Sequence, residues 1–336
     1  MGETEISWTH RPGTVGKTWN PIQGCRRVST GCENCYAERL AARFAETGWS
    51  QGLINLKTKK WNGVARLATH KLAEPLTWRK PATVFTNSMS DLFYDGFSNE
   101  QIAAVFGVMA AAPQHTFQVL TKRAKRMREW FEWAAGEFTM QQRDIAAAPH
   151  TFRAMLDAAY EELGKPVKPA LDAAWNAHEN DAWPLPNVWL GVSVENQEAA
   201  DERIPELLRT PAAVRFLSCE PLIGAVDLRH VQHNGEFEVD ALTGDHGVNR
   251  PLAGRGPGID WVIAGCESGP RSRPCDVAWL RALRDQCAAA GVPYFLKQAK
   301  YTPNEWVPGM SATLVVGNDK YHNAAIATIG RLLETK

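Results

Sequence analysis

Short apolar runs that alternate with helical stretches are the feature that most constrains the fold of this chain. Six runs are rich in β-branched or aromatic residues and are bounded by Gly, Pro or polar residues, as buried strands are. These runs are Thr83–Thr86, Thr116–Leu120, Val188–Val192, Val214–Leu217, Trp261–Ala264 and Pro293–Leu296. A further strand is expected near Thr18, just before a cysteine-rich segment.

Helix signals lie between these runs. Ser98 to Gln101 form a capping box, which predicts a helix from there onward. Helical sequence continues over residues 125–133, Asn196 is a cap for a helix reaching Leu208, and Asp276 caps another that ends at Gly291. Repeated strand–helix alternation implies parallel strands joined by helical crossovers. The sequence therefore predicts an α/β fold, a parallel (β/α) barrel that is full or partial.

The chain has 336 residues, which suits one large barrel. We expect a single barrel domain over residues 1–300 with two insertions. Residues 134–186 read as a mostly helical insertion, and residues 229–258, rich in Gly, Asp, Asn and His, as a loop or hairpin. Residues 301–336 are expected to form a C-terminal extension that completes or flanks the barrel.

Composition limits the function classes. Lys+Arg and Asp+Glu are equal at 37 each, so a strongly basic nucleic-acid binder is not indicated, although a local basic patch remains open. No apolar run is long enough to span a bilayer, and the first residues lack the basic start and apolar stretch of a secretory signal. We therefore expect a cytoplasmic protein without a membrane partner. The sequence does not indicate an oligomeric state.

Three cysteines lie within eleven residues. Cys25, Cys32 and Cys35 have the spacing C-x6-C-x2-C, and Gly24 and Gly31 permit the tight backbone that wraps thiolates around a metal. A structural zinc site normally has four ligands, whereas a four-iron cluster on three thiolates leaves one iron open to a substrate or cofactor. We favour the open cluster. The alternatives are a zinc site completed from afar, for which the candidates are His10, Cys219 and Cys266, or three unrelated thiols.

Polar residues follow every predicted strand. The active site of a parallel barrel forms where the carboxyl ends of the strands meet, so these residues are expected to line one mouth. A ring of structural salt bridges is the alternative. The residues are Asn87, Ser88, Ser90 and Asp91; Thr121, Lys122 and Arg123; Ser193, Glu195 and Asn196; Ser218, Cys219 and Glu220; Cys266, Glu267 and Ser268; and Lys297 and Gln298.

Two of these residues are thiols that directly precede a glutamate. If Cys219 and Cys266 face the mouth, either could donate a hydrogen atom to a substrate radical. The alternative is a small buried apolar residue, which is the commoner fate of a free cysteine. Cys275, in the following loop, and Cys287, on a helix, are expected to be packing residues.

Several motifs together resemble the phage three-cysteine-motif family, over about residues 8–300 apart from the two insertions. That family looks like a divergent branch of the radical S-adenosylmethionine enzymes. The motifs are Trp19–Cys25, Gly31–Glu38, Asn87–Phe93, Leu120–Arg123, Trp189–Asn196, Glu220–Leu222, Glu267–Pro270 with Arg273–Pro274, and Phe295–Gln298.

The resemblance implies a barrel of radical S-adenosylmethionine type with two cofactors. A [4Fe-4S] cluster on Cys25, Cys32 and Cys35 would bind S-adenosylmethionine at its open iron, and reduction would yield a 5′-deoxyadenosyl radical. An electron donor such as a flavodoxin or ferredoxin is then required. The resemblance places Ser90 or Asp91 near the methionine amine, and Ser193 and Glu195 near the ribose or carboxylate. Here the first gap between cysteines is six residues, whereas the superfamily usually has three.

The remaining residues of the mouth are candidates for catalysis or for substrate binding. Glu220, Glu267 and Lys297 join Cys219 and Cys266 as catalytic candidates, and Asn87, Lys122, Arg123 and Gln298 as substrate-binding candidates.

The phage setting suggests a nucleobase or nucleotide substrate in nucleic-acid modification or repair, inside a bacterium or a phage-infected host. The basic run Thr121–Arg128 would meet phosphates, unless it is a solvated helix face. The alternatives are radical modification of a small metabolite, or a non-catalytic zinc or iron–sulfur module that binds nucleic acid or a partner.

Overall fold

A computed structural model describes residues 3–298, apart from 142–146, 165–166, 169–170, 173–182, 234–236, 246–255 and 270. The expected extension over 301–336 lies outside these residues. Within them, no helix combines the length and the apolar character needed to cross a membrane.

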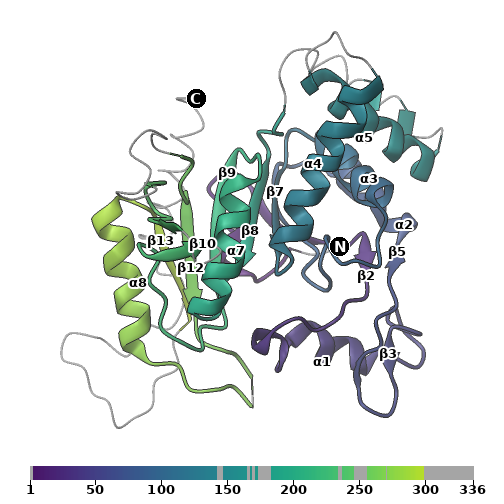
Figure 1. Ribbon diagram of the computed structural model, residues 1–336. Helices are drawn as coiled ribbons and strands as arrows, with labels where there is room; N and C mark the ends of the chain where they lie inside the picture. Colours follow the sequence, from purple (N-terminus) through teal and green to yellow (C-terminus); the bar gives the residue numbers. More distant parts are fainter. Residues whose placement is uncertain are drawn as a thin grey trace.

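Seven parallel strands form one curled sheet in which the spatial order equals the chain order (Figure 1). Each predicted strand is present, including the one near Thr18. The sheet curls into a half-barrel with β1 and β13 at its two edges, so the partial form of the predicted barrel is confirmed for the described residues. The strands are β1 (Val15–Trp19), β6 (Ala82–Thr86), β7 (Thr116–Thr121), β8 (Val188–Ser193), β9 (Val214–Cys219), β12 (Trp261–Gly265) and β13 (Tyr294–Gln298).

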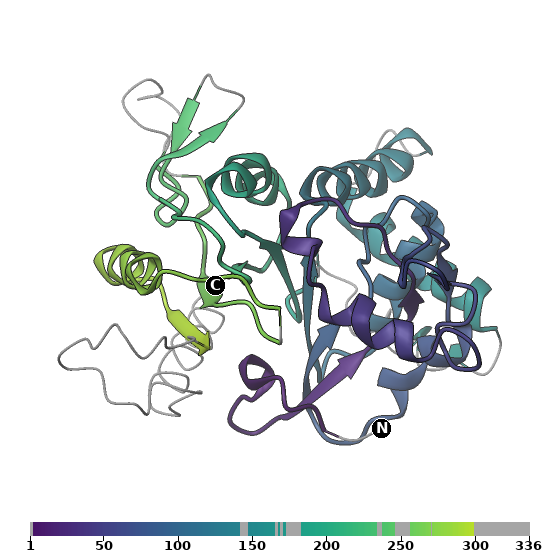
Figure 2. The same cartoon turned by 90° about the horizontal axis from the view of Figure 1, so that it is seen from below.

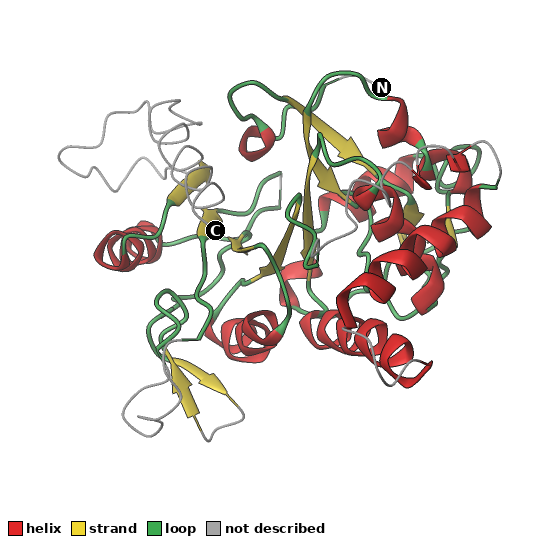
Figure 3. Ribbon diagram, turned by 90° about the horizontal axis from the view of Figure 1, so that it is seen from above, coloured by secondary structure: helices red, strands yellow, loops and turns green. Residues whose placement is uncertain are grey.

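The predicted helices cover the convex face of this sheet (Figures 1 and 3). The cap residues act as expected: Ser98 and Gln101 form the capping box, Asn196 accepts from the amide of Ala199, and Gly291 adopts a left-handed conformation with φ +71°. The helices are α3 (Asn99–Ala110), α4 (Ala124–Gln141), α7 (Gln197–Arg209) and α8 (Val277–Ala290).

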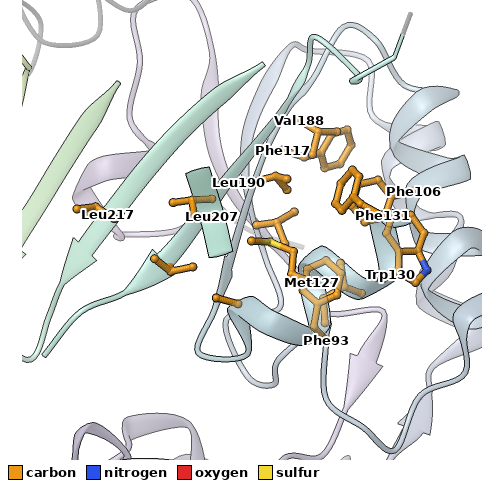
Figure 4. Packing of buried hydrophobic residues seen from close by; sticks show 14 of the residues in the cluster. Phe93, Phe106, Phe117, Met127, Trp130, Phe131, Val188, Leu190, Leu207 and Leu217 are labelled. Carbon is orange, nitrogen blue, oxygen red and sulfur yellow. The ribbon is translucent and has the colours of Figure 1, made fainter. Parts of the chain in front are cut away.

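Both faces of the sheet are apolar, which explains why the strands read as continuous rather than alternating runs. On the convex side, residues such as Phe117 and Leu190 pack against α3 and α4, where Phe106 and Trp130 stack (Figure 4). The concave side holds a separate aromatic cluster that Trp8, in the 3-10 helix η1 (Ser7–Thr9), closes. The cluster comprises Trp8, Phe85, Trp189, Val214, Phe216, Trp261, Ile263 and Phe295.

The two expected insertions show regular structure. Helix α4 runs through residue 134 without a break, and α5 (Ala147–Leu163) packs closely on α3 at Gly107, where a Cβ would lie 2.1 Å from the carbonyl oxygen of Met155. Within 229–258, β10 (Val231–His233) and β11 (Phe237–Val239) form an antiparallel pair, which projects from the sheet in Figure 2.

The sequence of Tyr36–Phe44 predicts a helix that begins near Cys35, and the structure confirms it; the rest of the small subdomain between β1 and β6 was not predicted. Its strands have two residues each, too few to carry a periodic pattern. Its main helix, α1, lies beneath the carboxyl ends of the strands in Figure 1. The elements are β2 (Ile22–Gln23), η2 (Thr30–Cys32), α1 (Tyr36–Arg43), β3 (Ile54–Asn55), β4 (Lys60–Trp61), β5 (Arg66–Leu67), α2 (Thr69–Leu72) and η3 (Glu74–Thr77).

Candidate functional site

The three cysteines lie on one loop, residues 24–35, which we call the cysteine loop. It leaves the sheet after β1 and β2 and ends where α1 begins. Gly24 starts it with φ +94°, and a Cβ there would lie 2.0 Å from the carbonyl oxygen of Val64. A parallel bridge joins Gly24 to Ser90, whose hydroxyl donates to the carbonyl of Ile22 at 2.7 Å. Ser90, predicted to bind cofactor, thus fixes the start of the cysteine loop.

The three thiols are free, partly exposed and electrostatically coupled. Burial raises the pKa of Cys25 to about 12, with Asp91 adding to the rise and Cys35 and Cys32 contributing further. Burial also raises the pKa of Cys35, while the first amides of α1 act against this shift without forming a capping hydrogen bond to it. The raised pKa values favour the neutral thiol at Cys25 and Cys35, and a cation bound beside them would favour the thiolate instead.

No compact mononuclear metal site is present in the described part of the chain. No three His, Cys, Asp or Glu side chains there are arranged to hold a metal ion. A zinc ion with Zn–S bonds near 2.3 Å would require thiolate sulfurs within roughly 3.8 Å of one another. The proposed completion of such a site by His10, Cys219 or Cys266 is accordingly not seen among the described residues.

Arg123 joins the cysteine loop to the ends of β6 and β7. Its guanidinium lies 3.9 Å from the sulfur of Cys25, 2.8 Å from the carbonyl oxygen of Arg26 and 2.8 Å from a carboxylate oxygen of Asp91. Asp91 also accepts from the hydroxyl of Thr121 at 2.7 Å and from the amide of Lys122 at 3.1 Å. These contacts occupy both carboxylate oxygens of Asp91, a predicted cofactor ligand.

Glu195 supports the cysteine loop from behind. It is buried and accepts two hydrogen bonds from the buried guanidinium of Arg203, at 2.7 and 3.3 Å. Gly31 packs against it so closely that a Cβ would lie 2.9 Å from the carboxyl carbon of Glu195. Burial would raise the pKa of Glu195, but Lys122 and Arg203 outweigh burial and hold that pKa below its usual value.

A third buried carboxylate holds the other side of the cysteine loop. Glu267 accepts from the side-chain amide of Asn34 at 3.0 Å and from the guanidinium of Arg273 at 2.6 Å. Arg273 in turn donates to the carbonyl of Thr30 at 2.9 Å and pairs with Glu33 at 3.2 Å. The end of β12 is thereby tied to the segment that carries Cys32 and Cys35.

Glu220 has its own cation at the sheet edge. Lys297 donates to both of its carboxylate oxygens at 2.7 and 2.8 Å, and the amide of Gln298 lies 3.3 Å from one of them. All four predicted carboxylates therefore have a basic partner. These ion pairs hold the loops at the strand ends together, as expected for the alternative of a ring of structural salt bridges. Contacts to a ligand would then come from polar side chains other than these carboxylates.

Lys122 and Asn87 are the predicted residues least engaged by the protein. In the described structure Lys122 has no ion pair; its charge opposes the rise in the pKa of Cys35 and helps to hold the pKa of Glu195 below its usual value. Asn87 is buried, adopts a left-handed φ of +61°, and neither polar atom of its amide has a partner. An orphaned buried amide costs about 1–3 kcal/mol, which a ligand or water would recover.

The two thiols proposed as hydrogen donors differ in placement. Cys219 is fully buried in the convex-side core, so its side chain points away from the concave face. There Cys287 of α8 contributes to the raised pKa of Cys219. That position favours the packing alternative for Cys219. Cys266 is also buried but follows the last residue of β12 and contacts Cys275 in the adjacent loop.

Sequence analysis missed the residues that bind two of the carboxylates, Glu195 and Glu267. Arg203 lies on α7 one turn before Leu207, at a position that faces the core. A charged residue in a core-facing position is a signal for a buried ion pair, and it was available in the sequence. Asn34 gave no such signal, because its partner Glu267 lies far away along the chain. Arg273 gave none either, because it meets Glu267 in an irregular loop that no helix or strand pattern describes.

An apolar stripe on α1 is exposed next to the cysteine loop. Tyr36, Leu40 and Phe44 are spaced four residues apart and so lie along one side of the helix. Tyr36 donates a hydrogen bond to the carbonyl of Ser88, which places the start of the stripe at the end of β6. All large apolar side chains that are exposed in the described structure fall between residues 28 and 64.

We predict that Gly31→Ala will displace the cysteine loop. The new methyl group meets the carboxylate of Glu195, which cannot move aside because Arg203 holds it. A loss of about 1–3 kcal/mol in unfolding free energy is expected from urea denaturation, as for other overpacked sites. Gly31→Ala in a Glu195→Ala background is the control, because the three atoms nearest to the new methyl group all belong to the Glu195 side chain. An equal loss from Gly31→Ala in both backgrounds would show that the contact with Glu195 is not the cause.

Comparison with known proteins is informative only at the level of family. Neither a search of curated proteins nor one of solved structures finds a significant match. A family model does match, over residues 3–335, and its description is "Protein of unknown function (DUF5131)". Because that match spans nearly the whole chain, the protein belongs to the DUF5131 family of proteins of unknown function.

Proposed function

We propose that this protein is a radical S-adenosylmethionine enzyme whose [4Fe-4S] cluster is held by Cys25, Cys32 and Cys35, in a partial barrel of the type found in that superfamily. The observation that carries the proposal is the position of the cysteine loop. Three coupled thiols lie at the carboxyl ends of parallel strands, which is where α/β barrels place their chemistry. The resemblance of the surrounding motifs gives independent support.

The ligand set fits a cluster better than a zinc ion. In a cluster each thiolate binds a different iron, so the sulfurs are spread more widely than around one ion. The cysteine loop supplies three thiols, which would bind three of the four irons and leave the fourth open. Arg123, 3.9 Å from the sulfur of Cys25, supplies positive charge beside the anionic thiolates.

The cluster would supply the electron that cleaves S-adenosylmethionine to a 5′-deoxyadenosyl radical. The protein's own residues supply position and polarity. Lys122 offers a free ammonium to a carboxylate, and Asn87 offers an amide donor and acceptor to a polar edge. Ser193 and Glu195 remain candidates for cofactor contacts, although Glu195 contributes chiefly by holding Arg203 and the backbone at Gly31.

We favour a nucleobase or nucleotide as the substrate over a nucleic-acid polymer. The basic run after β7 is largely committed to the protein: Arg126 donates to Asn99, and Arg128 pairs with Glu132 and Glu206. Lys125 faces Glu129 one turn away. Few cations in this run remain for a phosphate backbone, so a small substrate at the carboxyl ends of the strands fits better. A small metabolite other than a nucleotide would use the same chemistry.

Anaerobic incubation with S-adenosylmethionine and dithionite tests the proposal. We expect 5′-deoxyadenosine and methionine to accumulate in equal amounts, measured by liquid chromatography and mass spectrometry after cluster reconstitution. Lys122→Met should weaken S-adenosylmethionine binding or cleavage while leaving iron content unchanged, because its charge acts on Cys35 and Glu195 but no ion pair in the described structure ties its side chain to the cysteine loop. Reconstituted protein that contains four irons and forms no 5′-deoxyadenosine would contradict the proposal.

The electron donor is expected to dock on the subdomain that carries α1. Residues 25–65 contain seven basic and three acidic residues, and they also hold the exposed apolar stripe beside Cys35. A basic, partly apolar surface suits an acidic electron-transfer protein such as a flavodoxin or ferredoxin.

Charge reversal on this surface gives a direct test. Arg43→Glu combined with Lys60→Glu, both exposed, should slow cluster reduction by a reduced flavodoxin roughly tenfold at low salt and little at high salt. Stopped-flow absorbance would measure the rate. Arg284→Glu, exposed on α8, is the matched control and should leave it unchanged. An equal loss with the control would exclude this surface.

A further inference from the structure

Gln118 is a buried amide that the protein leaves without a hydrogen-bond partner. It lies on β7, is fully buried, and neither its Oε1 nor its Nε2 has a partner in the described structure. Its neighbours Phe117 and Val119 pack in the convex-side core (Figure 4), so the side chain of Gln118 points to the concave side. Buried amides are normally paired, because an unpaired one has given up its hydrogen bonds to water without replacement. This amide is therefore available to a ligand.

The surroundings of the Gln118 amide are aromatic and uncharged. Phe85 on β6 and Trp189 on β8 are the register partners of Gln118, and both belong to the concave aromatic cluster. The indole nitrogen of Trp189 is a second buried donor without a partner in the described structure. Arg11 borders this patch, where its guanidinium lies 4.8 Å from the ring centre of Trp189 and donates to the hydroxyl of Thr116 at 3.0 Å. A neutral ring with polar edges suits the amide itself better than an anion does.

A second unpartnered amide follows the adjacent strand. Asn87 comes two residues after Phe85, at the carboxyl end of β6, and its backbone amide donates to the carbonyl of Trp19 at 2.7 Å. Its side chain is buried, and both polar atoms lack a partner in the described structure. Two residues of a strand span roughly 6–7 Å. Asn87 thus lies that much nearer to the mouth than Gln118, on the path of a ligand that enters from the strand ends.

We propose that the concave face of the half-barrel is a nucleobase site, in which the amide of Gln118 binds the polar edge of the base. A nucleobase is planar and neutral and carries adjacent donors and acceptors. Those properties match an amide that offers one of each between aromatic rings. This inference deepens the proposed function and rests on it for the reaction that follows binding. Binding itself requires neither the cluster nor S-adenosylmethionine.

Trp8 closes this site in the described structure. It lies on η1, outside the sheet, and its ring centre is 4.5 Å from that of Phe85, the register partner of Gln118. The base takes the position of the indole, because both are planar rings that pack on Phe85 and the base also pairs with the Gln118 amide. The seven-stranded ladder does not include η1, so the displacement of Trp8 leaves the strand pairing intact.

Equilibrium binding of nucleosides to the full-length protein tests the inference. Adenosine, guanosine, cytidine and uridine are titrated separately into cluster-free and reconstituted protein, and isothermal titration calorimetry gives the affinities. We expect at least one nucleoside to bind both forms, and ribose 5-phosphate, which has an anion and no base, to bind neither. Trp8→Ala should bind that nucleoside more tightly, because the competing ring is gone. Weaker binding by Trp8→Ala, or equal binding of ribose 5-phosphate, would place the ligand elsewhere and overturn the inference.

Two matched glutamine variants separate base recognition from a structural role. Gln118→Met keeps the length of the side chain and removes the amide, so nucleoside affinity should fall roughly tenfold while the melting temperature does not fall. Gln286→Met, on α8, removes an amide that is paired with the carbonyl of Val226 at 3.1 Å and the backbone amide of Leu228 at 2.7 Å. That control should lower the melting temperature and leave the affinity unchanged. A lowered melting temperature with unchanged affinity in Gln118→Met would overturn the inference.

Cleavage of S-adenosylmethionine distinguishes this inference from the proposed function. Gln118→Met should still form 5′-deoxyadenosine from S-adenosylmethionine alone, because its changed side chain lies on the concave face of β7 and not on the cysteine loop. Native protein that forms 5′-deoxyadenosine and binds no nucleoside would overturn the inference and leave the proposed function standing. Native protein that binds a nucleoside through Gln118 and forms no 5′-deoxyadenosine would support the inference and contradict the proposed function.

Discussion

Replacement of Cys25, Cys32 and Cys35 together by Ala is expected to abolish iron binding. The native protein, reconstituted anaerobically, should contain about four irons and four sulfides per chain with broad visible absorbance. The triple variant should fall to background in both, because the loop then has no thiolate and no other set of ligands in the described structure can hold a metal. Metal analysis and absorbance spectra of the two proteins make the comparison.

Cys275→Ala is the matched control for this experiment. It removes one partly exposed thiol that lies outside the cysteine loop, so iron content should be unchanged. About one zinc per chain in the native protein, lost in the triple variant, would replace the cluster with a closed zinc site and remove the proposed reaction with it. Metal content that is unaffected by the triple change would show that the loop binds no metal.

The fold was predictable because its strands are buried on both faces. A run such as Val188–Val192 is apolar throughout only where helices cover one side and a second core fills the other, and both cores are present. Helix caps such as Asn196 were equally clear, since a cap depends on two or three neighbouring residues. Apart from the helix α1 itself, the α1 subdomain was not predictable in this way, because contacts distant in sequence, such as Arg66 to Gln23, hold it together.

The candidate site was predictable in position and less so in role. Parallel strands deliver their following residues to one edge whatever those residues do, which is why Asp91, Glu195 and Glu267 were located correctly at strand ends. Their roles depend on which basic side chain, from another part of the chain, forms an ion pair with each of them. Arg203 lies on α7 and Arg273 in the loop before α8, and the strand pattern predicts neither ion pair.

The Arg203–Glu195 ion pair affects the stability of the whole fold. We expect Arg203→Met to lower the unfolding free energy by about 3–5 kcal/mol at pH 7, measured by urea denaturation. Arg203 and Glu195 are each only 2% exposed, so the change leaves a buried carboxylate without its closest cation. Arg153→Met is the control: it breaks an ion pair with Asp157 in which the side chains are 56% and 64% exposed, and should cost less than about 1 kcal/mol.

The pH dependence separates lost charge pairing from lost packing. In the native protein the pKa of Glu195 is lowered, so its contribution to stability is present above the unfolded pKa of about 4.3 and is lost as pH falls. In Arg203→Met, burial acts with less opposition and raises the pKa of Glu195. The variant's deficit should therefore be largest at pH 7 and shrink towards pH 4.5, as Glu195 becomes neutral.

A second change tests the same cause at constant pH. Adding Glu195→Leu to Arg203→Met removes the stranded charge and should restore most of the lost stability, because an apolar pair avoids desolvation. A deficit that neither acid nor the second change relieves would mean that packing of the Arg203 side chain, not its charge, supports α7. Because Gly31 rests on Glu195, iron retention should follow stability through the series, and the ion pair then belongs to the metal site as much as to the core.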